Sequence, residues 1–217
     1  KIDIVGGGRW FKHNGGTSYT ANIIDDTQRF ARAAAGQLKV GGRPEVVFVV
    51  GDGVGPLKWY EWNGSTWAGH DLLGYDVDHG HSLQIADIDR DGHLDIFNAE
   101  MRLDGGNPNA RMRIFYGDGV GNFTLSVVAT AYGNHESKVG DLNDDGRLDI
   151  LGKPYNCDTP RVDVWLQNDT TTTPPYSLDS WTYIPADNSR APSAFGNGTF
   201  GLGFGDLNGD GYQDIVS

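Results

Sequence analysis

Apolar residues in this chain occur in short runs, separated by segments rich in glycine, aspartate and asparagine. Residues 82–86 and 96–99 flank one polar segment, and residues 138–140 and 150–152 flank another. Short apolar or alternating runs bounded in this way are typical of β-strands. Residues 30–35 are the exception, because their pattern favours one helical turn. We therefore expect an all-β fold with very little helix.

Aromatic and β-branched residues gather around glycine-containing turns in residues 59–67 and 112–123. A third set, residues 162–166 and 181–184, is divided by a segment rich in threonine and proline. Asn-Gly and Asp-Gly between such runs are signals for β-hairpins. Each polar segment is therefore followed by a predicted strand and then by a predicted hairpin.

The polar segments share one nine-residue pattern, found at residues 87–95, 141–149 and 206–214. Positions 1, 3, 5 and 9 carry carboxylates or amides, and position 6 is glycine. Oxygen ligands at this spacing, with a glycine at the sharp turn, are typical of calcium sites. The side chains predicted to bind three Ca²⁺ ions are Asp87, Asp89, Asp91, Asp95, Asp141, Asn143, Asp145, Asp149, Asp206, Asn208, Asp210 and Asp214. The backbone carbonyls predicted to join them are those of His93, Arg147 and Tyr212.

The pattern differs from an EF-hand, which needs an acidic residue at position 12 and a helix on each side. Position 12 here is Asn98, Gly152 or Ser217. The loop therefore joins two strands, and the acid at position 9 can close the metal cage. The alternative is a set of solvated Asp-Gly turns, which three copies with the same ligand pattern disfavour.

Two further copies of the loop are incomplete. Asp3 matches position 9 of a loop whose start is absent, so we expect the chain to belong to a longer protein. Residues 37–45 keep the glycine and the following strand, but Gln37, Lys39 and Gly41 replace the ligands. We interpret this copy as a repeat without calcium, with the charge of Lys39 in the metal's place.

Repeats of about 40–60 residues that each hold four short strands fit the blades of a β-propeller. We expect a single propeller segment over residues 1–217, with about four blades and the calcium loops between strands one and two. The expected blade phases are residues 1–36, 37–86, 87–140 and 141–205, with 206–217 starting the next blade or closing the first.

The acidic loops resemble those of FG-GAP and VCBS repeats, which form the propellers of integrin α-subunits and of many secreted proteins. Residues 204–211 and 116–123 are similar to recurring phrases of that family. The resemblance implies that the calcium loops lie on the face opposite the usual ligand site. Family members include lectins, adhesion receptors and polysaccharide lyases, and their propellers usually have seven or eight blades. About four blades here imply a piece of a longer protein or a small ring whose ends share a blade.

The net charge of −12 argues against nucleic acid and anionic membranes as partners, and three Ca²⁺ ions would halve it. No apolar run approaches the roughly 18 residues of a membrane span. Cys157 is the only cysteine, which excludes an internal disulfide.

Calcium binding predicts a secreted or cell-surface protein, because extracellular modules commonly bind calcium with Kd of roughly 10⁻⁴–10⁻³ M. The four glycosylation sequons, at Asn63, Asn122, Asn168 and Asn197, weakly support a glycoprotein.

The face opposite the calcium loops can be located by the phase of the repeat. His81, His135 and Phe200 stand six residues before the three acidic loops, with His79, Glu136 and Lys138 beside them. The residues predicted to form the ligand-binding face are Arg9, Trp10, His81, Glu100, Arg102, His135, Lys153 and Tyr155. Aromatic rings that stack on sugars and cations that pair with carboxylates favour a carbohydrate ligand, with an extracellular protein as the next candidate.

An enzymatic alternative is a lyase of acidic polysaccharides. His81 or His135 would be the base, Tyr155 the acid, and Arg102 or Lys153 the group that neutralises the uronate. The structural alternative is that both histidines cap strand ends through hydrogen bonds. The matched phases of the two chain ends allow a third role, self-association into a surface assembly.

Overall fold

The structure is a computed structural model that describes residues 2–101, 107–154, 161–168, 180–187 and 201–216. Its elements are all β-strands, as the sequence predicts. The helical turn predicted at residues 30–35 is wrong, because residues 31–36 form a strand that pairs with residues 45–50. No helix in the described residues is long and apolar enough to cross a membrane.

The strands form antiparallel sheets that follow one another along the chain. The first sheet holds β1 (Ile4–Gly6), β2 (Arg9–Gly15) and β3 (Ser18–Ile23). The second sheet holds β4 (Ala31–Gly36), β5 (Glu45–Val50), β7 (Leu57–Trp62) and β8 (Trp67–Asp71). The third sheet holds β10 (Ser82–Ala86), β11 (Asp95–Ala99), β12 (Arg111–Gly117) and β13 (Phe123–Thr130). The fourth sheet holds β14 (Glu136–Gly140), β15 (Asp149–Lys153), β16 (Val162–Gln167) and β17 (Trp181–Asp187).

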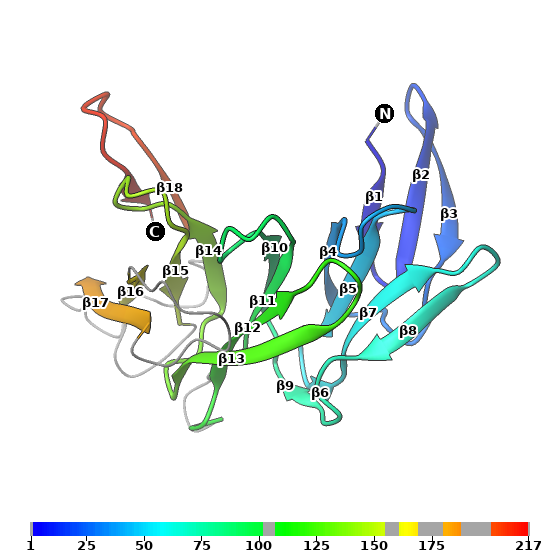
Figure 1. The fold of residues 1–217 in the computed structure, drawn as a ribbon, viewed down its shortest axis with the longest axis horizontal. Helices are drawn as coiled ribbons and strands as arrows, with labels where there is room; N and C mark the ends of the chain where they lie inside the picture. Colours follow the sequence, from blue (N-terminus) through cyan, green and yellow to red (C-terminus); the bar gives the residue numbers. More distant parts are fainter. Residues whose placement is uncertain (1, 102–106, 155–160, 169–179, 188–200, 217) are drawn as a thin grey trace.

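Two small sheets complete the described strands, formed by β18 (Gly203–Gly205) with β19 (Asp214–Val216), and by β6 (Val54–Gly55) with β9 (Val77–Asp78). Figure 1 shows the larger sheets side by side in an open arc, with β1–β3 at one end and β18 at the other. The described strands therefore do not close into a ring.

Every nine-residue loop joins the first strand of a sheet to the second. The pairs Ala86 with Asp95, Gly140 with Asp149 and Gly205 with Asp214 show the same register in the three acidic loops. Gly36 pairs with Glu45 in the same way in the loop that lacks the ligands. One repeat geometry therefore serves loops with and without the acidic ligands.

The hydrophobic core lies between neighbouring sheets. The second strands β5, β11 and β15 are buried along their length, because each has a sheet on both faces. On β11, Ile96 contacts the cluster shared with the second sheet, whereas Phe97 contacts the cluster shared with the fourth. Leu38 and Ile88, at position 2 of their loops, are fully buried in these clusters. These two loops are therefore each anchored by an apolar side chain between two sheets, whereas Leu207, at position 2 of the last loop, is exposed.

The first strands of successive sheets also meet: β10 contacts both β4 and β14. Gln84 on β10 joins two of them, since its Nε2 donates to the Ser137 carbonyl at 2.5 Å. Its Oε1 accepts the Val139 amide at 3.0 Å. This side chain takes the place of a direct backbone ladder between two sheets.

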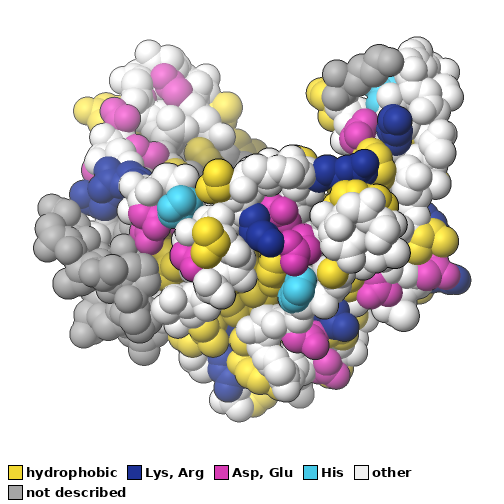
Figure 2. Space-filling model, turned by 45° about the vertical axis from the view of Figure 1, so that its right-hand side comes forward, with side chains coloured by type: hydrophobic (Ala, Val, Ile, Leu, Met, Phe, Trp, Pro, Cys, Tyr) yellow, Lys and Arg dark blue, Asp and Glu magenta, His cyan; other side chains and the backbone are white. Residues whose placement is uncertain are grey.

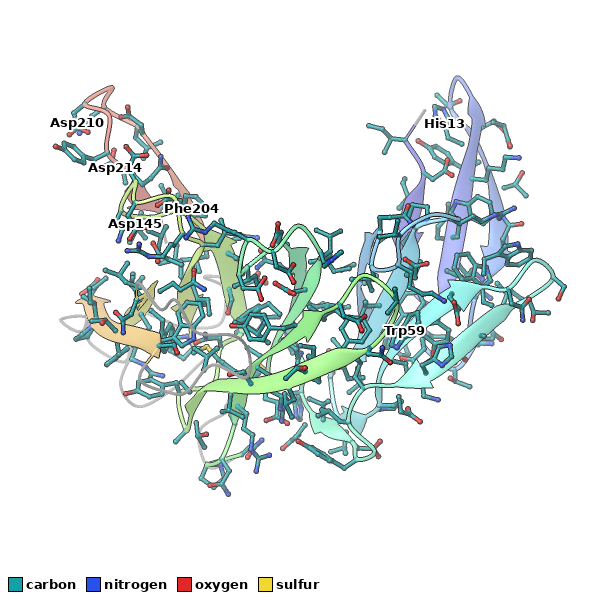
Figure 3. The ribbon with its side chains drawn as sticks, in the orientation of Figure 1. His13, Trp59, Asp145, Phe204, Asp210 and Asp214 are labelled. Carbon is teal, nitrogen blue, oxygen red and sulfur yellow. The ribbon has the colours of Figure 1, made fainter. Side chains whose placement is uncertain are left out.

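The glycine before the second acidic loop makes room for an aromatic side chain. A Cβ added to Gly140 would lie 2.1 Å from the ring of Phe204 on β18. Figure 3 shows Phe204 where the C-terminal hairpin meets the fourth sheet. The same Cβ on Gly205, the equivalent position of the last loop, would meet no atom within 4 Å.

We therefore expect Gly140→Ala to destabilise the protein by about 1–3 kcal/mol, because the added methyl group would overpack against Phe204. Gly205→Ala, the matched control, should be neutral or slightly stabilising, because alanine loses less backbone entropy than glycine. Denaturant unfolding of both variants measures the difference. Equal effects would contradict the packing described for the fourth sheet.

Candidate functional site

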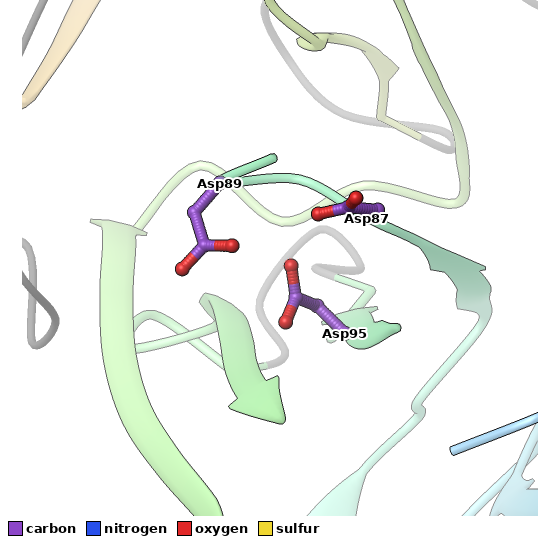
Figure 4. A group of neighbouring side chains, drawn as sticks. All are labelled: Asp87, Asp89 and Asp95. Atoms are coloured by element: carbon purple, nitrogen blue, oxygen red, sulfur yellow. The ribbon is translucent and has the colours of Figure 1, made fainter. Parts of the chain in front are cut away.

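The first acidic loop brings three carboxylates together. One oxygen from each of Asp87, Asp89 and Asp95 lies within 4.8 Å of the others, and Figure 4 shows the three side chains around a common centre. Asp87 and Asp89 come from the loop, whereas Asp95 is the first residue of β11. Among the described residues this is the one group of three or more acidic, histidine or cysteine side chains with such spacing.

Asp95, at position 9, is held by backbone amides on both sides. Its Oδ2 accepts the Ile88 N–H at 2.7 Å, and its Oδ1 accepts the Gly117 N–H at 2.9 Å. Burial raises the pKa of Asp95 to about 7, against the opposing effect of these hydrogen bonds. The side chain thus joins the loop, the second strand and the end of the third strand β12.

The same arrangement recurs in full at Asp149, and in part at the ninth acid of two other repeats. Asp149 accepts the Leu142 N–H at 2.9 Å and the Gln167 N–H at 2.8 Å. Asp214 accepts the Leu207 N–H at 3.0 Å, and Asp3 accepts the His13 N–H at 2.8 Å. The acid at position 9 therefore has a structural role that sequence reasoning missed, although its position at the start of the second strand was predicted.

Position 1 retains an oxygen that no described residue satisfies. Asp87 Oδ2 accepts the Gly92 N–H at 3.1 Å, whereas the buried Oδ1 has no hydrogen-bond partner among the described residues. Gly92 adopts a φ of 91°, in the left-handed region that favours glycine. Burial, followed by the charge of Asp91, raises the pKa of Asp89. An oxygen without a partner beside two further carboxylates is a suitable ligand set for a hard cation.

The second and third loops differ from the first at position 3. Asn143 Nδ2 donates to Asp145 Oδ2 at 2.9 Å, and Asn208 Nδ2 donates to Asp210 Oδ2 at 3.0 Å. In the second loop the guanidinium of Arg147 also pairs with Asp145. These two loops hold part of their negative charge in internal contacts, and their role as metal ligands stays a prediction, as do the carbonyls of His93, Arg147 and Tyr212.

The loop at residues 37–45 is filled by protein groups. Gln37 Nε2 donates to the carbonyls of Lys39 and Gly41, at 2.6 and 2.7 Å. The Lys39 ammonium pairs with Glu61 on β7, outside the loop. The amide of Gln37, and not the charge of Lys39, therefore binds the oxygens at the centre of this loop.

A second group of polar residues lies at the opposite ends of the first strands. The rings of His81 and His135 lie 4.5 Å apart between centroids, and Glu136 Oε1 is 3.9 Å from His135 Nδ1. A hollow of about 190 Å³ is lined by Arg32, His81, Glu136 and Lys138, among others. The structure therefore brings together the histidines that the repeat phase placed on one face.

Arg32 determines how His81 is protonated. Its guanidinium carries only donors, so His81 Nδ1, at 2.9 Å from Arg32 Nη2, accepts this hydrogen bond. His81 Nε2 then carries the proton and donates to Asp52 Oδ1 at 2.9 Å. Both ring nitrogens of His81 are occupied, which disfavours His81 as a base.

Of the other predicted face residues, Lys153 lies beside this cluster, since its carbonyl accepts the His135 amide at 2.9 Å, but it is only 2% exposed. Glu100 is only 3% exposed, lies 2.9 Å from Arg113, and accepts the Asp78 and Arg111 amides. On β2, Arg9 pairs with Asp26 and Trp10 donates to Asp3, both at 2.8 Å. Arg102, Tyr155 and Phe200 lie outside the described residues.

Sequence reasoning missed Phe30, Arg32 and Asp52 on this face. Phe30 is 84% exposed, and its carbonyl accepts the Gly51 amide beside Asp52. Arg32 stands five residues before the loop at residues 37–45, next to the phase that selected His81 and His135. The same count of six residues, applied to the repeat without the acidic ligands, selects Ala31, the neighbour of Arg32.

Repeated antiparallel sheets, with an acidic loop between the first and second strands of three of them, define a β-rich repeat module. Residues 42–97 match the model of the FG-GAP-like repeat, from the end of one loop through the first acidic loop. Residues 42–97 are thus similar to an FG-GAP-like repeat, which confirms the predicted resemblance. No curated protein matches the chain.

Burial and the nearby charges of His81 and Arg32 lower the pKa of His135 to about 4, from its ordinary value of 6.5. Between these pH values the unfolded chain therefore binds more protons than the folded chain. Proton binding then favours the unfolded chain, so the free energy of unfolding decreases as the pH falls from about 6.5 to 4. His135→Gln should remove this loss, so its melting temperature should fall less on acidification than that of the parent protein.

Melting curves from pH 7 to about pH 4.5, recorded with a chelator to silence metal-linked carboxylates, test this expectation. Parallel pH profiles of the two proteins would contradict the neutral, buried state of His135.

Proposed function

We propose that this chain is part of an extracellular, calcium-stabilised β-propeller that binds a carbohydrate on the face opposite its acidic loops. The observation that carries the calcium proposal is the convergence of Asp87, Asp89 and Asp95, with the unpartnered Asp87 Oδ1 beside them. Calcium prefers six to eight oxygen ligands, and carboxylates are its strongest protein ligands. A bound ion would offset the repulsion among three neighbouring acids.

Support for a propeller comes from the contacts between first strands and from the sheets placed side by side along the arc in Figure 1. In a propeller, four-stranded sheets surround a central axis with their first strands innermost. The loops and the cluster around His81 lie at opposite ends of these strands, which separates metal binding from ligand binding.

Support for a carbohydrate ligand comes from the groups that surround the small hollow. Phe30 offers an exposed ring near Arg32, and His81, Glu136 and Lys138 offer polar groups at the hollow itself. Apolar ring faces beside a few fixed polar groups are typical of sugar sites. An extracellular protein is the alternative partner for the same face.

A polysaccharide lyase is the second candidate function, favoured by one observation. His135 has a depressed pKa, so its imidazole is neutral near pH 7, and it lies beside the cation Arg32. A neutral imidazole can accept a proton, and a nearby cation can stabilise a uronate carboxylate as charge develops.

Calcium should raise the free energy of unfolding by about 2.7 kcal/mol per site at 100 times Kd. Asp89→Ala should remove the calcium-dependent increase that comes from the first loop, because it deletes one of the three carboxylates. The substitution should cost little stability by itself, since the hydrogen bond that Asp89 Oδ1 accepts from the Asp91 amide is long, at 3.3 Å. Glu45→Gln, in the loop without the acidic ligands, should keep the full calcium-dependent increase. Thermal melts with calcium and with chelator measure both. A melting temperature that ignores chelator would contradict the calcium proposal.

A glycan array tests the ligand face, with Arg32→Gln as the variant and Arg29→Gln as the matched control. We expect Arg32→Gln alone to weaken binding at least tenfold, about 1.4 kcal/mol, because Arg32 borders the hollow. New ultraviolet absorbance from an unsaturated uronate would favour the lyase instead. Unchanged binding by Arg32→Gln would contradict the assignment of this face.

A further inference from the structure

The second acidic loop, residues 141–149, is bound by an arginine of its own sequence. The guanidinium of Arg147, at position 7, pairs with the carboxylate of Asp145, one of the predicted metal ligands. Figure 3 shows Asp145 at the loop end of the fourth sheet. The Nε of Arg147 also donates to the Gln167 carbonyl on β16 at 2.9 Å. The Arg147 side chain is therefore held at two points, on its own loop and on the third strand of the sheet.

A second arginine reaches the same loop from the neighbouring repeat. Arg90, at position 4 of the first acidic loop, donates from its Nη1 to the Gly146 carbonyl at 3.2 Å. Burial acts to raise the pKa of Asp145, but the amide and the charge of Arg147 lower it on balance, and the charge of Arg90 adds to this effect. Two positive charges therefore act on one carboxylate of the second loop.

The aspartate at position 1 differs between the first and second loops. Asp141 Oδ2 accepts the Gly146 N–H at 2.8 Å, and its Oδ1 accepts the Asp145 N–H at 3.1 Å. Asp87, the equivalent residue of the first loop, keeps a buried Oδ1 without a partner among the described residues. The second loop thus satisfies this carboxylate from its own backbone, whereas the first loop does not.

The difference between the two loops comes from their side chains, because their ends share one register. Position 3 is Asp89 in the first loop and Asn143 in the second, so the second loop has one carboxylate fewer. Position 7 of the first loop is His93, whose ring lies against Gly119, since a Cβ on that glycine would be 2.3 Å from His93 Nδ1. Calcium affinity depends on the number of charged ligands. The second loop therefore offers less charge and already carries a cation.

We propose that arginine takes the place of a metal ion in the second acidic loop: Arg147, supported by Arg90, keeps it closed at calcium concentrations that fill the first loop. This inference rests on the calcium site proposed for the first loop. A calcium ion in the second loop would have to displace Arg147 from Asp145 and to lie beside two guanidinium charges. The repeats then satisfy their loops in three ways: with the amide of Gln37, with arginine, and with a metal ion.

An arginine in the second loop reduces the expected number of calcium ions from three to two. The third acidic loop has Gly209 at position 4 and Tyr212 at position 7, so neither position supplies a cation there. Calcium should therefore order the loop between β10 and β11, whereas the loop between β14 and β15 should be ordered with or without the ion.

Hydrogen–deuterium exchange of the whole chain, read by mass spectrometry with calcium and with a chelator, tests each loop separately. Isothermal titration with calcium chloride counts the bound ions in parallel. The variants are Arg147→Gln and Arg90→Gln, and Arg29→Gln is the control, because Arg29 is exposed and pairs with Asp26 outside the acidic loops. Melting curves in calcium show whether each variant is folded, and Arg90→Gln, at an exposed position, is the milder change.

In the parent protein, we expect the chelator to speed amide exchange at least tenfold at residues 87–95 and to leave residues 141–149 unchanged. Arg147→Gln should make exchange at residues 141–149 calcium-dependent and should add one bound calcium ion per chain. Arg90→Gln should shift exchange in the same direction to a smaller extent, whereas Arg29→Gln should change neither loop.

Calcium that slows exchange in both loops of the parent protein would overturn the arginine proposal and leave the first site intact. An Arg147→Gln protein that folds and gains no calcium would also overturn it, because arginine would then not be what excludes the ion. If Arg147→Gln does not fold, parent-like exchange in Arg90→Gln decides against the proposal. No calcium response at either loop would contradict the site in the first loop as well.

Discussion

A carboxylate at position 9 that accepts a backbone amide of its own loop is the interaction on which the repeats depend. Asp95 joins the Ile88 amide of its loop to the Gly117 amide of the third strand, and Asp149 joins Leu142 to Gln167 in the same way. Hydrogen bonds to a charged group contribute about 1.5–3 kcal/mol each, and a buried carboxylate without them would be strongly destabilising. These bonds fix where each loop ends and therefore how the next strand enters the sheet.

This constraint separates the structural role of the loop from its proposed chemistry. Glu45 holds the Lys39 amide at 3.0 Å in the loop where Gln37 bonds to the central carbonyls, so the repeat geometry persists without the acidic ligands. In the first loop the carboxylates of Asp87 and Asp89 converge with Asp95 instead. A metal ion there would stabilise a loop whose ends the ninth residue already fixes. Figure 2 shows acidic and basic side chains interspersed over the visible surface, so the acidity of the chain does not form one continuous patch there.

Much of the fold could be predicted from the sequence, because short apolar runs and a repeated loop leave few alternatives to successive antiparallel sheets. The helical turn at residues 30–35 failed because pairing with β5 overrides local preference. The role of the ninth acid was hidden, since its amide partners Gly117 and Gln167 lie more than 15 residues further along the chain. Arg32 was missed because it lies in the repeat without the acidic ligands, one residue away from the phase that selected His81 and His135.

The central claim is that the first acidic loop binds calcium, and long-wavelength X-ray diffraction from crystals grown with calcium tests it most directly. The account predicts an anomalous peak between the carboxylates of Asp87, Asp89 and Asp95, and no such peak at residues 37–45. Density at the first loop without an anomalous signal, or a peak inside the loop that holds Gln37, would contradict it.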